Sequence, residues 1–181
     1  MNKTILIELD EQYLAGQISE VAKWFNHVLT IQTALEHVVA NAIPTIMEPH
    51  IREAIEKMKR ANKHHTECAK ELFRVIDKSP NTVSDQLTGQ TVANMETALF
   101  SLQDVMGGAA GSWKQLHSLL HINQQAMGAF AVAEQLGLSL GMKEIVALAF
   151  PIVHEKTMHQ LLLQEYMLEM APISILYKQN T

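Results

Sequence analysis

The stretch 142–170 constrains the fold of this chain more than any other. Apolar residues recur along one side of it at helical spacing, and Glu155 and His159 fall on that same side. The apolar residues of that side are Ile145, Leu148, Ile152, Leu163, Tyr166 and Met170, and Val146, Phe150, Val153 and Leu161 cover the other sides. A helix that is apolar all round is buried among other helices, and buried charged groups need partners. The stretch therefore predicts a helical bundle with a polar layer in its middle.

The composition fits one domain with a large core. The chain has 181 residues, of which 48% are hydrophobic and 18% are charged, whereas charged residues average about 25% in soluble domains. Either little surface is exposed or another subunit covers some of it, so we expect a homodimer formed through apolar helix faces. We expect a single domain over 1–181, with an N-terminal arm at 1–9 and a C-terminal tail at 171–181.

Charge and cysteine content exclude several classes of partner. The formal net charge of −5 argues against nucleic-acid binding, which needs a basic face. No apolar run reaches the roughly 20 residues of a membrane span. The single cysteine, Cys68, cannot form an internal disulfide and fits a reducing compartment. The sequence thus predicts a cytoplasmic protein that contacts neither nucleic acid nor membrane.

Periodicity and breakers divide the chain into helices. We expect four long helices and one shorter helix between the second and the third, with almost no strand signal. Their ranges are about 10 or 18 to 42, 49–77, 84–106 for the shorter helix, 112–138 and 142–170. Most connections are short, so neighbouring helices should be antiparallel. The predicted fold class is an all-α antiparallel four-helix bundle.

Polar residues on the inner faces of these helices suggest a metal site. The first helix offers Gln32 and Glu36, the second Asn62 and His65, the third His117, His121 and Gln124, and the fourth Glu155 and His159. Carboxylates and imidazoles from four helices hold two iron or manganese ions in bundle proteins. We expect Glu36, His65, His121, Glu155 and His159 as ligands, with His64, Glu67 and His117 as less favoured ones.

The usual dimetal pattern is incomplete in this sequence. Such bundles use a Glu-x-x-His pair on two helices and a lone Glu on the other two, but the chain contains no Glu-x-x-His. A set rich in histidine would also suit zinc. The alternative interpretation is structural: His65 is a hydrogen-bonded core histidine, His117 and His121 are flank residues, and Glu155 forms an ion pair with His121 or His159.

The run 133–137, Ala-Glu-Gln-Leu-Gly, is followed by an apolar helix that leads to His154-Glu155-Lys156, and the second helix carries 64–67 followed by 72–76. In the placement of these segments the chain resembles, over about residues 20 to 170, the YciF/YciE-like stress proteins, a branch of the ferritin-like superfamily. The resemblance implies a ferritin-like bundle, often dimeric, with a dimetal centre. By position, Glu36 and Glu155 match the acids of the first and fourth helices, and His121 stands close to the acid of the third.

The second helix departs from that pattern because its pair is reversed: His64 or His65 precedes Glu67. Two main hypotheses for function follow. The first is a ferritin-like protein that binds one or two ions of iron, manganese or zinc in stress response or metal handling, where bound iron would react with dioxygen or peroxide. The second is a metal-free, non-catalytic bundle that acts as a homodimer or binds a partner protein. A third hypothesis is a bundle that binds a small apolar ligand between its helices.

Overall fold

The computed structural model describes residues 11–80 and 111–177, with side chains from residue 15 onward. It contains four long helices, α1 (Glu11–Ala42), α2 (Pro49–Val75), α4 (Ser112–Leu140) and α5 (Lys143–Ala171), with a short 3-10 helix η1 (Ile43–Thr45) and a final π-helix η2 (Pro172–Leu176). The described ranges contain no strand. The predicted arm at 1–9, the shorter helix at 84–106 and the end of the tail lie outside the described residues.

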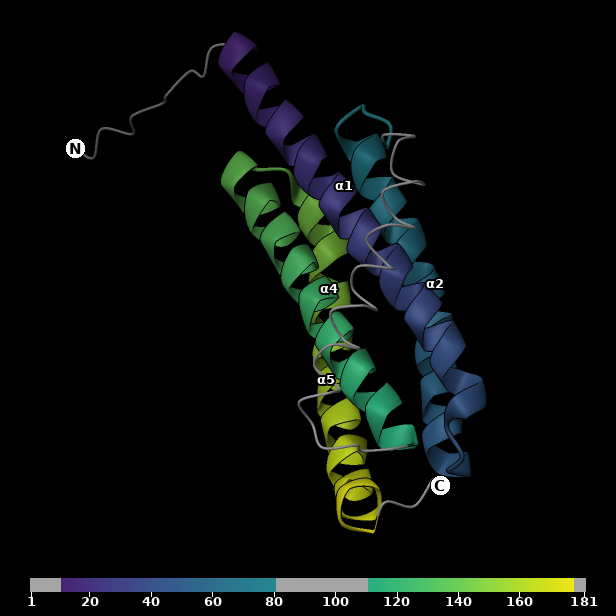
Figure 1. Cartoon of the computed structure of the whole chain (residues 1–181). Helices are drawn as coiled ribbons and strands as arrows, with labels where there is room; N and C mark the ends of the chain where they lie inside the picture. The colour runs from purple at the N-terminus through teal and green to yellow at the C-terminus, as the bar shows by residue number, and fades with distance from the viewer. Residues whose placement is uncertain (1–10, 81–110, 178–181) are drawn as a thin grey trace, which may run out of the picture.

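The four helices form an antiparallel bundle (Figure 1). Each helix packs against two neighbours, in the order α1, α2, α5, α4 and back to α1. α2 and α4 run in the same direction on one diagonal, and α1 and α5 run in the opposite direction on the other. The predicted all-α bundle is confirmed, and none of the helices in the described ranges is long and apolar enough to span a bilayer.

Short connections set the two helix hairpins. Pro44 lies in the 3-10 turn that follows α1, and Pro49 opens α2, where a missing N–H costs nothing. Between α4 and α5, Gly141 adopts a left-handed conformation with φ of 68°. Its N–H bonds to the Leu138 carbonyl, and the next N–H, of Met142, bonds to the Gly137 carbonyl. Such bonds satisfy the carbonyls left free at a helix C-terminus.

The core is mostly apolar on both sides of one polar layer, although Ser112 and Ser174 are also fully buried. Its largest fully buried aromatic side chains are Phe25, Phe73 and Phe130, and the rings of Phe25 and Phe73 meet edge to face with centroids 5.9 Å apart. Trp24 lies beside the core and donates its indole N–H to the Ala129 carbonyl at 3.0 Å, which ties α1 to α4. This packing leaves the inner faces of all four helices close together at mid-height.

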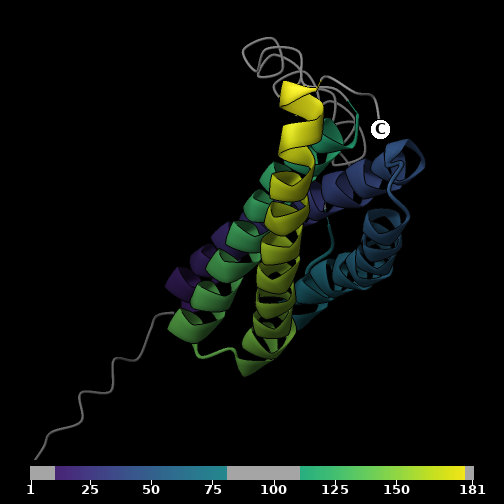
Figure 2. The same ribbon diagram turned by 90° about the horizontal axis from the view of Figure 1, so that it is seen from below.

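The prediction that α5 is buried all round is wrong on its outer side. Ile145, Ile152 and Leu163 are buried as expected, but Phe150 and Leu161 are 59% and 57% exposed. A helix in a four-helix bundle has an inner face and two flanks covered by neighbours, so nothing within the described bundle covers its outer face. Figure 2 shows α5 at the outside of the bundle.

Gly137 is needed for close packing rather than for ending α4, which continues to Leu140. A Cβ built at Gly137 would lie 2.9 Å from both Cβ and Cγ2 of Ile145. Because Ile145 is fully buried at the start of α5, it has little room to move. The absent side chain at Gly137 thus lets α5 approach α4 beside their turn.

We predict that Gly137→Ala destabilises the protein. The overpacking against Ile145 costs about 1–3 kcal/mol, which exceeds the helix-propensity gain of up to about 1 kcal/mol. Gly128→Ala is the matched control, because a Cβ at Gly128, in the same helix, would meet no atom within 4 Å. Urea unfolding followed by circular dichroism should show a lower free energy of unfolding for Gly137→Ala and a higher one for Gly128→Ala, each relative to the wild type. Equal changes in the two variants would contradict the packing role of Gly137.

Candidate functional site

A buried polar layer crosses the bundle at mid-height, with one residue from each long helix. These residues are Gln32 on α1, Asn62 on α2, Asn123 on α4 and Lys156 on α5, and each is at most 2% exposed. Polar side chains at such positions cost free energy unless they are hydrogen-bonded. The layer therefore marks the place where the sequence departs most from an apolar core.

Hydrogen bonds connect this layer across all four helices. Asn62 Oδ1 accepts a bond from Lys156 Nζ at 3.1 Å and one from Gln32 Nε2 at 3.3 Å. Gln32 Nε2 also donates a hydrogen bond to the backbone carbonyl of Asn62 at 3.0 Å. On the other side, Asn123 Nδ2 donates to the Lys156 carbonyl at 3.0 Å and to Gln160 Oε1 at 2.8 Å. The layer is thus one network rather than four separate polar residues.

The amine of Lys156 lies at the centre of this network. The side chain is 0% exposed, and its Nζ lies 5.8 Å from the centroid of the Phe130 ring. An ammonium has three protons to donate, but within the described ranges only Asn62 Oδ1 accepts a hydrogen bond from it. Desolvation therefore lowers the pKa of Lys156 to about 7, although the nearby Glu155 carboxylate opposes the shift.

His65 and Glu155 form a second pair beside the layer. His65 Nε2 lies 2.8 Å from Glu155 Oε2, with the imidazole fully buried and the carboxylate half exposed. Burial lowers the pKa of His65 to about 4, and the Lys156 charge adds to this effect while Glu155 opposes it. The imidazole is thus neutral near pH 7, and its Nε2–H donates to the carboxylate. The other ring nitrogen, Nδ1, is buried and has no hydrogen-bond partner among the described residues.

His159 extends this pair along α5. Its ring centroid lies 6.4 Å from that of His65, and its Nδ1 is buried without a partner in the part of the chain that the structure describes. Burial lowers the pKa of His159 as well. The structure thus brings together three of the five expected ligands, His65, Glu155 and His159.

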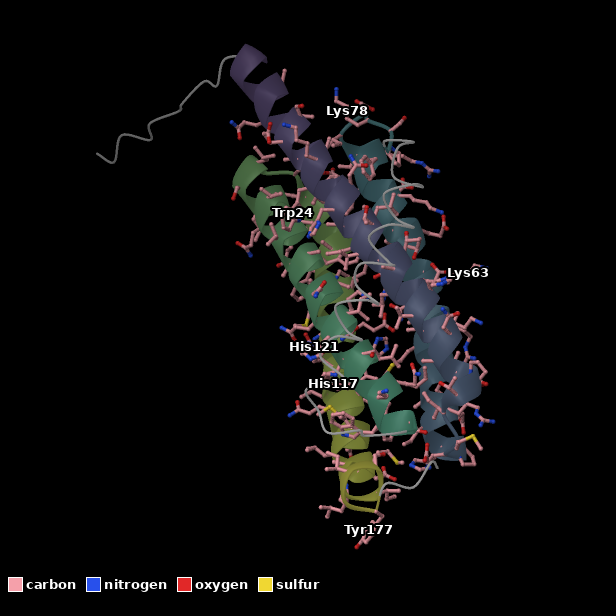
Figure 3. The ribbon with its side chains drawn as sticks, viewed as in Figure 1. Trp24, Lys63, Lys78, His117, His121 and Tyr177 are labelled. Atoms are coloured by element: carbon pink, nitrogen blue, oxygen red, sulfur yellow. The ribbon has the colours of Figure 1, made fainter. Side chains whose placement is uncertain are left out.

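The other two expected ligands have different partners. Glu36 accepts a hydrogen bond from Thr66 Oγ1 at 2.7 Å. His121 is exposed on α4, and its Nε2 lies 3.1 Å from that of His117 (Figure 3). The His117 ring in turn stacks on Trp113, with centroids 5.2 Å apart. These contacts explain both residues without a shared metal, and their role as ligands stays a prediction.

The less favoured ligands on α2 lie on its outer side. His64 is exposed, with its Nε2 3.6 Å from the Cys68 sulfur, and Glu67 is exposed and forms an ion pair with Lys70 at 2.9 Å. Across residues 11–80 and 111–177, no group of three or more His, Cys, Asp or Glu side chains is arranged to hold a metal ion.

Lys156 and Asn123 are the layer residues that sequence reasoning missed, and a spacing signal could have found Lys156. Dimetal bundles carry Glu-x-x-His on two helices and a single Glu on the other two. Here Asn62 stands three residues before His65, and Lys156 stands three residues before His159. Gln32 and Asn123 supply the single residues of α1 and α4 to the same layer. The histidine positions of the pattern are kept, while an amide or an amine stands at each of the four carboxylate positions.

This layer does not fit a dimetal centre. Two divalent ions carry four positive charges, which the four carboxylates of the usual site offset. Three neutral amides and one amine supply no negative charge, and a protonated Lys156 would repel a cation. Among the described residues, Glu155 is the carboxylate that contacts His65 beside the layer, and it lies half exposed. The chemistry of these donors therefore argues for a network that holds a proton rather than metal ions.

We predict that the stability cost of Lys156 depends on pH. Its pKa is about 7 in the folded protein and about 10.4 in an unfolded chain, so the unfolded state binds more protons between these values. The cost is therefore fully present below pH 7 and disappears as the pH rises toward about 10.4. The unfolding free energy of the wild type minus that of Lys156→Met should therefore increase by about 4 kcal/mol as the pH rises from 7 to about 10.4.

Urea unfolding of both proteins at pH 7, 8.5 and 10 measures that difference. Lys156→Met leaves Asn62 Oδ1 bonded to Gln32, so the substitution should not strand an acceptor. A difference that does not change with pH would show that the Lys156 amine keeps its ordinary pKa.

Comparisons with known proteins support the fold. No protein family matches the sequence, and no curated protein shows significant similarity to it. Two solved structures are similar. One is a protein from Xanthomonas campestris pv. campestris, with a TM-score of 0.69 and 14% identity over 90% of this chain and 97% of that one. The other is a ferritin-like diiron-carboxylate protein from Bacillus anthracis str. Ames, with a TM-score of 0.64 and 12% identity over 83% of this chain and 97% of that one. The chain thus has the ferritin-like helical-bundle fold.

Proposed function

We propose that this chain is a ferritin-like bundle without a dimetal centre, which acts through protein–protein contact rather than redox chemistry. The buried amine of Lys156, bonded to Asn62 in the middle of the polar layer, is the observation that carries the proposal. An amine there occupies one of the four positions from which a carboxylate would bind metal. The second of the two sequence-based hypotheses is therefore favoured over the first.

The layer fulfils structural tasks in this proposal. Lys156 Nζ and Gln32 Nε2 both donate to Asn62 Oδ1, which ties the layer together without a metal, although Gln32 Oε1 has no hydrogen-bond partner among the described residues. Polar groups that must meet their partners also favour one register of the four helices over its shifted alternatives. The outer surface of the bundle is then the part that remains available for function.

We predict that the protein purified without a histidine tag contains no stoichiometric iron, manganese or zinc. Elemental analysis measures the metal content, and thermal unfolding with added Fe²⁺, Mn²⁺ or Zn²⁺ should leave the melting temperature unchanged, because a ligand that binds only the folded state would raise it. One or two equivalents of tightly held metal would overturn the proposal.

A gain-of-binding variant tests the correspondence between this layer and a dimetal site. Asn62→Glu combined with Lys156→Glu restores Glu-x-x-His on α2 and α5, so Zn²⁺ or Mn²⁺ should raise the melting temperature of the double variant but not of the wild type. Asn62→Gln combined with Lys156→Gln is the matched control, because it changes the same positions without adding carboxylates. Equal responses of the two double variants would refute the correspondence.

A second candidate is a single metal ion at His65, Glu155 and His159, in metal handling or in the stress response implied by the resemblance to YciF/YciE-like proteins. These three side chains are not arranged as a metal site in the described structure, so they would have to move to bind the ion. The buried, unpartnered Nδ1 of His159 and the meeting of His65 Nε2 with Glu155 Oε2 at 2.8 Å favour it over a dimetal centre. Iron, manganese or zinc that is bound by the wild type and lost in Glu155→Ala/His159→Ala would select this candidate.

A further inference from the structure

The outer face of α5 carries a row of exposed apolar side chains. Phe150, Met158, Leu161 and Leu168 are each 54–61% exposed. Their spacing places all four within one side of the helix, opposite the buried residues Ile152, Lys156 and Leu163. Apolar side chains that gather in one exposed patch usually mark an interaction site. We call these four residues the α5 stripe.

The α5 stripe is arranged symmetrically about residues 159 and 160. Phe150 and Leu168 lie about equally far on either side of this point, and so do Met158 and Leu161. If a second copy of α5 lay antiparallel against the first with the two-fold axis at this point, Phe150 would face Leu168 of the second copy. Met158 would face Leu161 of the second copy in the same way. Each apolar side chain of the stripe then has an apolar partner.

Polar residues within and beside the α5 stripe follow the same symmetry. His154 lies between Phe150 and Met158 in the stripe, and Glu165 lies between Leu161 and Leu168, while Thr157 and Gln164 are exposed at one edge of it. Each pair is centred near the same point, and in an antiparallel helix pair residues on one side of the contact face residues on the same side. His154 would thus meet Glu165 of the second copy, which pairs a hydrogen-bond donor with a carboxylate, and Thr157 would meet Gln164.

The last described residues after α5 fit this arrangement. Ile175, Leu176 and Tyr177 are exposed beyond α5, and Tyr177 lies at the end of the bundle opposite the turn between α4 and α5 (Figures 1 and 3). An antiparallel pairing brings this end of one copy beside the α4–α5 turn of the other. Leu138, just before that turn, is 54% exposed, so it offers an apolar surface at the matching place.

From these observations we infer that the α5 stripe binds a second copy of this chain, in an antiparallel two-fold dimer centred at residues 159 and 160. The inference rests on the proposed function, because it names the partner of a bundle that acts by protein contact. A two-fold interface uses the same patch on both subunits, and a patch that matches itself under this operation suits a second copy better than an unrelated protein. The dimer would also cover the outer face that the sequence predicts to be buried.

Analytical ultracentrifugation of the full chain tests the inference. We expect the wild type to be a dimer at micromolar concentration. Leu161→Arg places two like charges near the two-fold axis and should weaken the dimer at least about 30-fold. Val132→Arg is the matched control, because Val132 is exposed on α4, away from the stripe, and it should leave the dimer intact. Circular dichroism verifies that both variants keep their helices.

A charge exchange tests the antiparallel register. His154→Glu sets two carboxylates against each other and should weaken the dimer about 10-fold, and His154→Glu combined with Glu165→Lys should restore it. A monomeric wild type, a dimer unaffected by Leu161→Arg, or a double variant as weak as His154→Glu alone would overturn the inference. None of these results depends on metal content, so failure of this inference is distinct from failure of the proposed function.

Discussion

The hydrogen bond between the Lys156 amine and Asn62 Oδ1 is the polar contact on which the centre of the bundle depends. An amine at 0% exposure is tolerated only if it has an acceptor and can lose its proton. Asn62 provides the acceptor and is held in place by Gln32. Because this network needs one residue from each of several helices, it fixes the height at which the helices meet, and ordinary apolar packing continues above and below it.

The same layer is the reason for proposing that this ferritin-like fold works without a metal. A dimetal bundle balances buried cations with buried carboxylates, and removal of the cations alone would leave those carboxylates unpaired at a high cost. In this chain amides and an amine replace the carboxylates, and the two histidines remain. His65 stays neutral because burial lowers its pKa to about 4. The layer therefore balances its charges without metal.

The fold could be predicted from the sequence, whereas the centre of the site could not. Periodic apolar residues and prolines predict the ends of the four long helices to within about two residues, except for the start of the first helix, which the pattern leaves open between 10 and 18, because burial of an apolar stripe dominates the packing of the helices. Lys156 was not predicted as a core residue because lysine is almost never fully buried. The apolar spacing instead placed its neighbour Glu155 on the inner side of the helix. Adjacent residues differ by about 100° around a helix, so a small rotation of α5 buries Lys156 and leaves Glu155 half exposed.

The exposed α5 stripe and the buried Lys156 lie on opposite sides of one helix, and both lower the stability of the single bundle. Bound metal stabilises the folded state of a metalloprotein through its binding free energy. A bundle without bound metal that also buries an amine has a smaller free energy of unfolding. Association of two folded copies stabilises them by mass action, and it covers Phe150 and Leu161, which are otherwise more than half exposed. Dimer formation through α5 would thus offset both costs at once.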